Sequence, residues 1–206
     1  MRNLNREDLI SILYGAAILG TGGGGSLTEG LEVIDEALAA GKTFTLVSFD
    51  EMDPDDIIGT PYACGAISPL TEEEKKKYAR LPETMESFYI MGMKQMEEYM
   101  GKEMKAVIST ELGGGNTATA LYCGAMSGKL IADGDPAGRS VPALQHSTYF
   151  LNDIPMCPIS VMARFGEGAI ITACLTMNVL RIWFAHWLLS ARTPWLLWTM
   201  LTPPAC

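Results

Sequence analysis

The sequence has few of the residues that most often build metal and redox centres. It contains only two histidines, His146 and His186, which are far apart, and its five cysteines include no Cys-x-x-Cys pair. An odd number of cysteines without paired spacing is typical of thiols that stay reduced in the cytoplasm. The N-terminal residues MRNLNREDLI also lack the apolar core of a signal peptide. We therefore expect a cytoplasmic protein without a histidine-rich metal cluster.

Basic residues are also scarce relative to acidic ones. Lysine and arginine number 15 against 24 aspartates and glutamates, which gives a formal net charge of -9. Phosphate and anionic lipid surfaces attract positive charge, so this balance argues against a nucleic acid or a membrane as partner. The 206 residues are 48% hydrophobic and 19% charged, a globular composition. We expect a small-molecule substrate as partner, and assembly into a homo-oligomer is left open.

The end of the chain differs in composition from the rest. No acidic residue follows Glu167, whereas all four tryptophans lie after residue 180. A membrane span is disfavoured because polar or rigid residues interrupt the apolar run: Arg181, His186, Arg192 and Pro194. A buried helix with an apolar end is a second interpretation. We favour a third, a frameshifted or truncated gene end, because permissible codons from residue 179 onward encode an amphipathic sequence in a shifted frame.

These observations divide the chain into three parts. We predict an α/β N-terminal domain over residues 1–165 and the start of a truncated second domain over 166–178. Residues 179–206 form the predicted aberrant tail, whose tryptophans would be an aggregation hazard if exposed. If the tail is aberrant, ending the chain after Asn178 should improve solubility.

Helical and strand patterns alternate before that tail. Asn5, with an acid three residues later, predicts the start of a helix that ends at Gly20, and a second helix is expected from about Ser26 to Gly41. Strands are expected within 43–49, 57–67, 157–163 and 168–175. The charged run 71–84 is interpreted as a solvated helix face or loop. The methionine-rich run 85–104 has a helical period, and core packing is favoured over an adaptable binding face.

Residues 105–135 form the clearest unit. A short strand (106–109) enters a Gly-rich turn, and a helix of small residues (116–126) leads to a second strand (130–132). This pattern predicts a βαβ unit with two parallel strands and a right-handed crossover. The chain is therefore expected to be α/β, with helices covering a mainly parallel sheet.

Acidic residues follow both strands of this unit. Ligands of open α/β sheets bind beyond the carboxyl ends of the strands, which is where Glu111, Asp133 and Asp135 are expected. The glycines 113–115 and Asn116 precede the helix, where free backbone N–H groups suit an anion or a polarised carbonyl oxygen. Arg139 suits a substrate carboxylate. Structural alternatives stay open: a tight turn, aspartates as turn formers, and an arginine ion pair.

A second glycine cluster lies near the N-terminus. Gly20, Gly22 and Gly25 fit Gly-x-Gly-x-x-Gly, but a dinucleotide fingerprint follows a strand, and this one follows a helix. The loop also lacks the Gly-Lys-[Ser/Thr] of a phosphate-binding loop. We therefore expect a helix–loop–helix that approaches either a ligand or the glycine loop after residue 111. His146 is interpreted as structural rather than as a proton donor, and Cys123 as a core residue.

Three stretches in this order, LGTGGGGSLTEG, ELGGGNTATAL and DGDPAGRSVP, resemble signature blocks of the DUF917 family, which is named for S-methyl thiohydantoin desulfurase. The resemblance covers about residues 5–178, the N-terminal domain of that family. It implies a three-layer α/β/α sandwich followed by a β-rich C-terminal domain, which is missing or truncated here. It also implies a small cyclic amide or thiohydantoin as substrate, hydrolytic loss of a methylthio group, and a relation to hydantoinase and oxoprolinase proteins.

Within this resemblance we assign roles from the chemistry of the residues. Glu111 or Asp133 is the expected catalytic carboxylate that activates water. The expected substrate-binding residues are Gly22, Gly23, Gly24, Gly114, Gly115, Asn116, Asp135 and Arg139. The metal and other cofactors stay unknown, with a divalent metal held by carboxylates left open. Two alternatives to an active hydrolase remain: a non-catalytic accessory subunit of a hydantoinase/oxoprolinase-like system, and an inactive truncated product.

Overall fold

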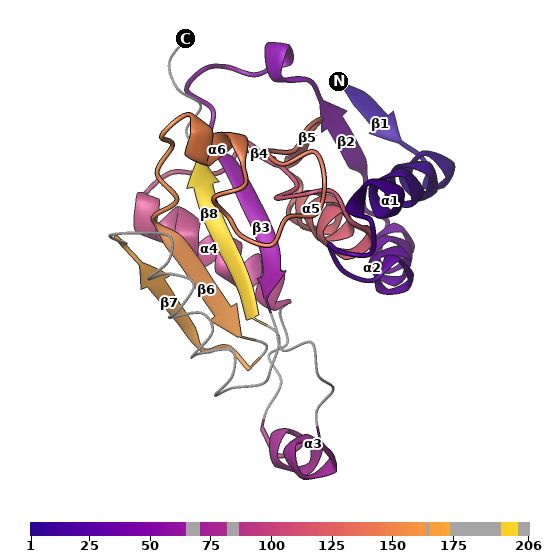
Figure 1. Ribbon diagram of the computed structural model, residues 1–206, viewed down its shortest axis with the longest axis vertical. Coiled ribbons are helices and arrows are strands. Elements are labelled where there is room, and N and C mark those ends of the chain that lie inside the picture. Colours follow the sequence, from indigo (N-terminus) through magenta and orange to yellow (C-terminus); the bar gives the residue numbers. More distant parts are fainter. Residues whose placement is uncertain (65–70, 82–86, 164, 174–194, 202–206) are drawn as a thin grey trace.

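An eight-stranded mixed sheet organises the part of the chain that the computed structural model describes, residues 1–64, 71–81, 87–163, 165–173 and 195–201 (Figure 1). Its strand order is β1-β2-β5-β4-β3-β8-β6-β7. The strands are β1 (Arg2–Leu4), β2 (Phe44–Val47), β3 (Ile58–Cys64), β4 (Ala106–Val107), β5 (Leu130–Ala132), β6 (Ile159–Ala163), β7 (Gly168–Ile171) and β8 (Trp195–Leu201). The helices are α1 (Arg6–Gly20), α2 (Leu27–Ala39), α3 (Glu72–Tyr78), α4 (Phe88–Met100), α5 (Gly114–Ser127) and α6 (Thr148–Leu151), with a 3-10 turn η1 at Phe49–Glu51.

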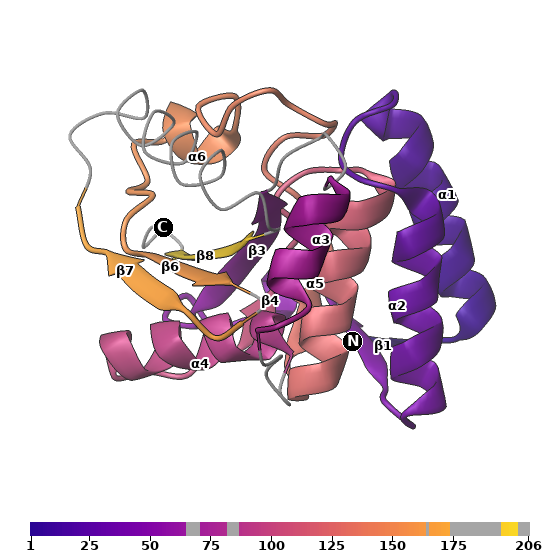
Figure 2. The ribbon, with the colours of Figure 1, turned by 90° about the horizontal axis from the view of Figure 1, so that it is seen from below.

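Most strands of this sheet run in one direction. Strands β2, β5, β4 and β3 pair in parallel, and β6 shares their direction because it pairs antiparallel with β8, which is itself antiparallel to β3. Strands β1 and β7 run the other way. In Figure 2, the strands β6 and β8 lie between α4 on one side and α6 on the other. The expected α/β class with a mostly parallel sheet is confirmed.

The first two helices begin where their capping residues predict. Asn5 accepts a hydrogen bond from the backbone N–H of Asp8, whose side chain accepts one from the N–H of Asn5. Ser26 caps α2 by accepting a hydrogen bond from the N–H of Glu29. Such caps satisfy backbone donors that a helix leaves without partners at its start. The loop between them, residues 21–26, is therefore held at both ends by regular structure.

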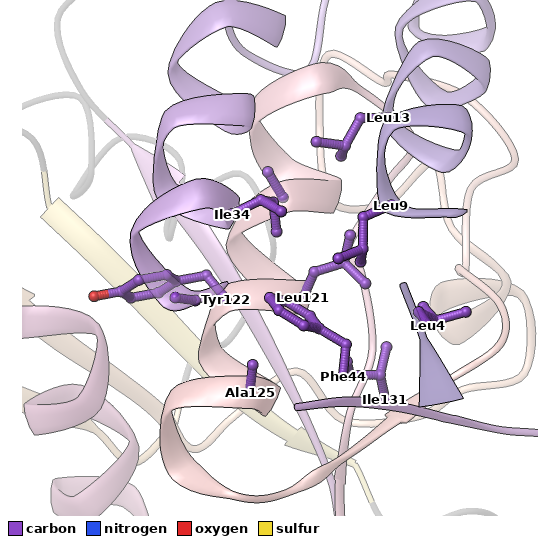
Figure 3. Packing of buried hydrophobic residues seen from close by; sticks show 11 residues of the cluster. Leu4, Leu9, Leu13, Ile34, Phe44, Leu121, Tyr122, Ala125 and Ile131 are labelled. Carbon is purple, nitrogen blue, oxygen red and sulfur yellow. The ribbon is translucent and has the colours of Figure 1, made fainter. Parts of the chain in front are cut away.

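Helices α1, α2 and α5 share one hydrophobic core with the β1–β2–β5 edge of the sheet. Figure 3 shows Leu9, Ile34, Phe44 and Leu121 packed together. Helix α5 is buried along most of its length because its side chains are small. At Gly124 an added Cβ would lie 2.6 Å from Cγ1 of Ile131 on β5. This tight packing brings the C-terminal part of α5 close to β5.

The βαβ unit is confirmed, and a second core lies beneath it. Strands β4 and β5 are adjacent and parallel, with Ala106 opposite Leu130. Met93, Met96 and Met104 are buried in the cluster that α4 forms with α5 and β4. These methionines therefore belong to the core, as predicted. Cys123 lies in the same cluster, and burial raises the pKa of its thiol.

Several elements were not expected from the sequence. Strand β1, helix α6 and the short η1 turn are additions, whereas helix α3 lies in the charged run, for which a solvated helix face was one of the two expectations. Strands β7 and β8 belong to the same sheet as the N-terminal strands, and β8 pairs with both β3 and β6.

Residues 174–194 and 202–206 lie outside the described residues, so the division at 165 and 178 and the aberrant tail stay predictions. Among the described residues, no helix has the length and hydropathy to cross a membrane.

Candidate functional site

The two glycine clusters are in direct backbone contact. The carbonyl oxygen of Gly24 accepts hydrogen bonds from the N–H groups of Gly115, at 2.9 Å, and Asn116, at 2.8 Å. Gly24 has φ +75°, and a Cβ added to it would lie 2.6 Å from Cα of Gly113. Only glycine combines this left-handed backbone with such a close approach. The first glycine loop therefore binds the start of α5. This agrees with one of the two interpretations of the sequence, in which the loop approaches the glycine loop after residue 111.

The third motif joins the same contact through Glu111. Glu111 as a residue is 9% exposed, and its carboxylate accepts hydrogen bonds from Asn116 Nδ2 (2.8 Å), Ser140 Oγ (3.3 Å) and the backbone N–H of Val141 (2.7 Å). A Cβ added to Gly23 would lie 2.3 Å from Ser140 Oγ. All three motifs that carry the family resemblance therefore meet at one point.

A pocket of about 240 Å³ lies beside this junction. It is bounded by the first glycine loop and α2, the start of α5, the end of β3, and one side chain of α4. Its lining residues are Gly24, Gly25, Ser26, Glu29, Gly30, Val33, Ala63, Tyr89, Glu111, Gly115, Asn116, Thr119 and Tyr122. Pockets of a few hundred cubic ångströms suit small ligands.

Two tyrosines contribute an aromatic wall to the pocket. The rings of Tyr89 and Tyr122 meet edge to face, with centroids 5.8 Å apart and an interplanar angle of 65°. Burial raises the pKa of Tyr89 to about 12, and a hydrogen bond with Thr119 opposes this rise. The Tyr122 hydroxyl, 3.3 Å from Glu36, donates to that carboxylate, and burial raises its pKa as well. Both hydroxyls are therefore protonated at neutral pH.

Four of the predicted site residues line this pocket: Gly24, Glu111, Gly115 and Asn116. Gly23 and Gly114 instead make packing contacts, Gly23 with Ser140 and Gly114 with Leu27. Gly22 has φ +92°, and a Cβ added there would meet no atom of the described residues within 4 Å. The predicted substrate-binding role of these three glycines is not tested by their positions, but their packing is a structural reason for glycine at Gly23 and Gly114.

The polar residues after β5 lie away from the pocket lining. Asp133 is exposed, and its backbone N–H extends the pairing of β5 with β2 by donating to Val47. The carboxylate of Asp135 accepts the N–H groups of Ala137, at 3.2 Å, and Gly138, at 2.8 Å. These are the contacts of a turn-forming aspartate. The roles assigned to Asp133 and Asp135 in catalysis and binding stay predictions.

Arg139 is also exposed, and its Nε donates to the carbonyl oxygen of Ser140, at 3.3 Å. Its predicted role toward a substrate carboxylate stays untested.

The expected free N–H groups at the start of α5 require a correction. Those of Gly115 and Asn116 donate to Gly24, and that of Gly113 donates to Thr117 Oγ1, at 3.2 Å. The first two donors hold the two loops together in place of an anion, and the third is paired within the start of α5.

Sequence reasoning missed much of the pocket wall. Glu29 lies in the first turn of α2, Tyr89 in α4, and Thr119 and Tyr122 in α5. A glutamate one turn after a glycine loop is a usable signal for Glu29, but no local pattern marks the other three. Among the residues that the structure describes, no group of three His, Cys, Asp or Glu side chains is arranged to hold a metal ion.

The fold and this junction define an α/β domain with a pocket beside two glycine loops that are in contact. A family model described as "S-Me-THD-like, N-terminal domain" matches residues 7–173, and the chain belongs to this family. Among solved structures, the crystal structure of a protein from Chromobacterium violaceum is similar, with a TM-score of 0.73 and 21% identity. The match covers 98% of this chain and 56% of that one, so the chain spans little more than half of the relative's length. No curated protein matches the sequence.

Proposed function

We propose that the pocket beside Glu111 binds a small cyclic amide or thiohydantoin, and that the complete protein hydrolyses a methylthio group from its ring. The observation that carries this proposal is the buried side chain of Glu111, which lines the pocket where all three motifs meet. Membership of the S-Me-THD-like family supports the substrate class. The pocket volume of about 240 Å³ is compatible with a five-membered ring and a short substituent.

The hydrogen bonds of Glu111 leave it able to act as a general base. An ionised carboxylate has about four acceptor sites. Oε1 accepts from Asn116 and Ser140, whereas among the described residues Oε2 accepts only from Val141, which leaves one site on Oε2 for a water molecule. The three donors also fix the orientation of the carboxylate. General-base catalysis requires a base that is positioned within hydrogen-bond reach of the water it activates.

The proposed reaction balances with water as the only co-substrate. Water adds through its oxygen to the ring carbon that carries the methylthio group and a C=N bond. Glu111 accepts a water proton and passes it to the ring nitrogen. The C–S bond then breaks, the new C–O bond becomes a carbonyl, and the remaining hydroxyl proton leaves with sulfur as methanethiol. The product is a ring amide with an N–H group.

Asn116 is the proposed partner of Glu111 in this step. One N–H of its amide donates to Glu111, so the second N–H is available to a developing negative charge on the substrate. Asp133 remains the alternative base, with Asp135 and Arg139 as proposed orienting groups. Their exposed or turn-forming contacts give them less support than the pocket lining gives Glu111.

The experiment uses a full-length member of the family and an S-methyl thiohydantoin, with methanethiol release followed by a thiol reagent. We expect the Glu111→Gln change to reduce turnover by about 10²–10⁴-fold, the range for loss of a general base. Asp133→Asn is the matched control and should leave turnover within about twofold. Equal losses in both variants, or unchanged turnover in Glu111→Gln, would contradict the assignment. Ligand binding without any turnover in the unmodified protein would favour the accessory-subunit alternative.

A further inference from the structure

The charged residues that line the pocket are all of one sign. They are Glu29 and Glu111, and among the residues that the structure describes no lysine, arginine or histidine belongs to the lining. Arg139, the cation expected to bind a substrate carboxylate, is exposed, and its Nε donates to a backbone carbonyl. An anionic ligand would therefore enter the pocket without an opposite charge to pair with, which is costly where water is partly excluded.

Four backbone N–H groups at the pocket are already paired within the protein. The N–H groups of Gly115 and Asn116 donate to Gly24, and the N–H of Glu29 donates to Ser26 Oγ, at 3.3 Å. The N–H of Gly30 donates to the Ser26 carbonyl oxygen, at 3.0 Å. Helix N-termini bind anions through N–H groups that have no partner in the protein. These donors at the pocket already have partners, so they do not supply such a site.

Glu29 is held at the pocket by the helix that carries it. The Ser26 cap fixes the first turn of α2, and Gly30 brings α2 against α5: a Cβ added to Gly30 would lie 2.2 Å from the carbonyl oxygen of Gly114. Glu29 also acts electrostatically on the aromatic wall. Burial raises the pKa of Tyr89, and the charge of Glu29 contributes a further small rise.

We propose that Glu29 is a specificity-determining residue, which together with Glu111 restricts the pocket to uncharged rings that donate N–H groups and rejects rings that carry a carboxylate. This inference rests on the proposed function, because it selects among the cyclic amides considered there. A hydantoin ring offers N–H donors to carboxylate acceptors and carries no charge at neutral pH. A like charge placed against a binding surface is a general means of excluding a competing ligand.

The test compares two ligands of the same shape, hydantoin-acetamide and hydantoin-acetic acid, which differ by one negative charge. Their binding to this chain is measured by NMR titration at pH 7 and low salt. We expect the amide to bind at least about tenfold more tightly than the acid, as like charges a few ångströms apart predict. In Glu29→Gln, the ratio of the dissociation constant of the acid to that of the amide should fall by about fivefold.

Glu32→Gln is the matched control, because Glu32 is an exposed glutamate of the same helix that does not line the pocket. It should leave the ratio within twofold of the unmodified protein. Far-UV circular dichroism of both variants should show an intact helix, and Glu29→Asp should retain most of the preference. These results together would assign the discrimination to the charge of Glu29 rather than to helix stability or overall charge.

Three results would overturn the inference: equal or tighter binding of the acid, equal effects of Glu29→Gln and Glu32→Gln, or failure of either ligand to bind the folded chain. The proposed function fails separately. If the amide is preferred as expected but a full-length family member releases no methanethiol, the charge selection stands and the hydrolytic function does not. If methanethiol is released but the acid binds as well as the amide, only the role of Glu29 is contradicted.

Discussion

The backbone N–H of Val141 donates to Oε2 of Glu111 at 2.7 Å and joins the loop after β5 to the loop after β4. The same carboxylate binds Asn116 at the start of α5, so one buried side chain links two of the three motifs. The glycine loop before α2 completes the junction through Gly24. Glu111 is therefore both a structural link and the proposed catalytic base, and the two roles have separate consequences.

The structural role predicts that Glu111→Gln destabilises the fold. The amide keeps the volume of the side chain but replaces one acceptor oxygen with an NH₂ group, which cannot accept from Val141 or Asn116. Loss of a buried acceptor costs about 1–3 kcal/mol in free energy of unfolding. Urea unfolding measures this directly. Asp133→Asn, at an exposed position, should change stability by less than about 0.5 kcal/mol, and similar values for the two variants would contradict the link.

The contact between the glycine clusters predicts different costs at two neighbouring glycines. Gly22 and Gly24 both have positive φ, but an added Cβ meets no atom within 4 Å at Gly22 and lies 2.6 Å from Cα of Gly113 at Gly24. Gly22→Ala should cost only the backbone strain, about 1–2 kcal/mol. Gly24→Ala adds a clash with the backbone of Gly113 and should cost about 2 kcal/mol more. Equal losses in thermal unfolding experiments would show that the two loops do not touch.

The packing of α2 on α5 predicts a change of sign between two helical glycines. Alanine in place of an unconstrained helical glycine stabilises by about 0.5–1 kcal/mol. Gly15 in α1 has no atom within 4 Å of an added Cβ, so Gly15→Ala should be stabilising. At Gly30 the added Cβ would lie 2.2 Å from the Gly114 carbonyl oxygen, so Gly30→Ala should destabilise by about 1–3 kcal/mol. A stabilising effect at Gly30 would place the two helices farther apart.

Strand β8 makes the effect of removing the C-terminal residues testable. It pairs with β3 along Ile58–Cys64 and with β6 along Ile159–Ala163. A chain that ends after Asn178 loses these pairings and leaves strand edges that promote aggregation. These pairings predict lower solubility and a lower midpoint of thermal unfolding for the shortened chain. Equal or better solubility by size-exclusion chromatography would instead support the hypothesis of an aberrant tail.

Local signals were sufficient for the elements near the site. The caps Asn5 and Ser26 gave the starts of α1 and α2, and the change from a strand pattern to a small-residue helix gave the β4–α5–β5 unit. These features depend on residues a few positions apart, where capping and periodicity operate. For the first glycine loop the sequence left two partners open, a ligand or the loop after residue 111, and the structure shows contact with that loop.

The partners of individual groups at the site could not be predicted in the same way. The carbonyl oxygen of Gly24 accepts from the N–H groups of Gly115 and Asn116, a contact between segments distant in the chain. Sequence alone left those N–H groups available to a ligand. Similarly, Glu29 lines the pocket because of how α2 packs on α5, which depends on the close approach at Gly30. Such tertiary contacts are not encoded by any local pattern.

The central claim is that the three motifs enclose one ligand-binding pocket, and a crystal structure of this chain with a bound hydantoin tests it most directly. The account predicts the ring between the glycine loops, within hydrogen-bond distance of the Glu111 carboxylate or the Asn116 amide and against Tyr89. A hydantoin bound instead at the exposed loop of Asp133 and Arg139, with the pocket beside Glu111 empty, would contradict it.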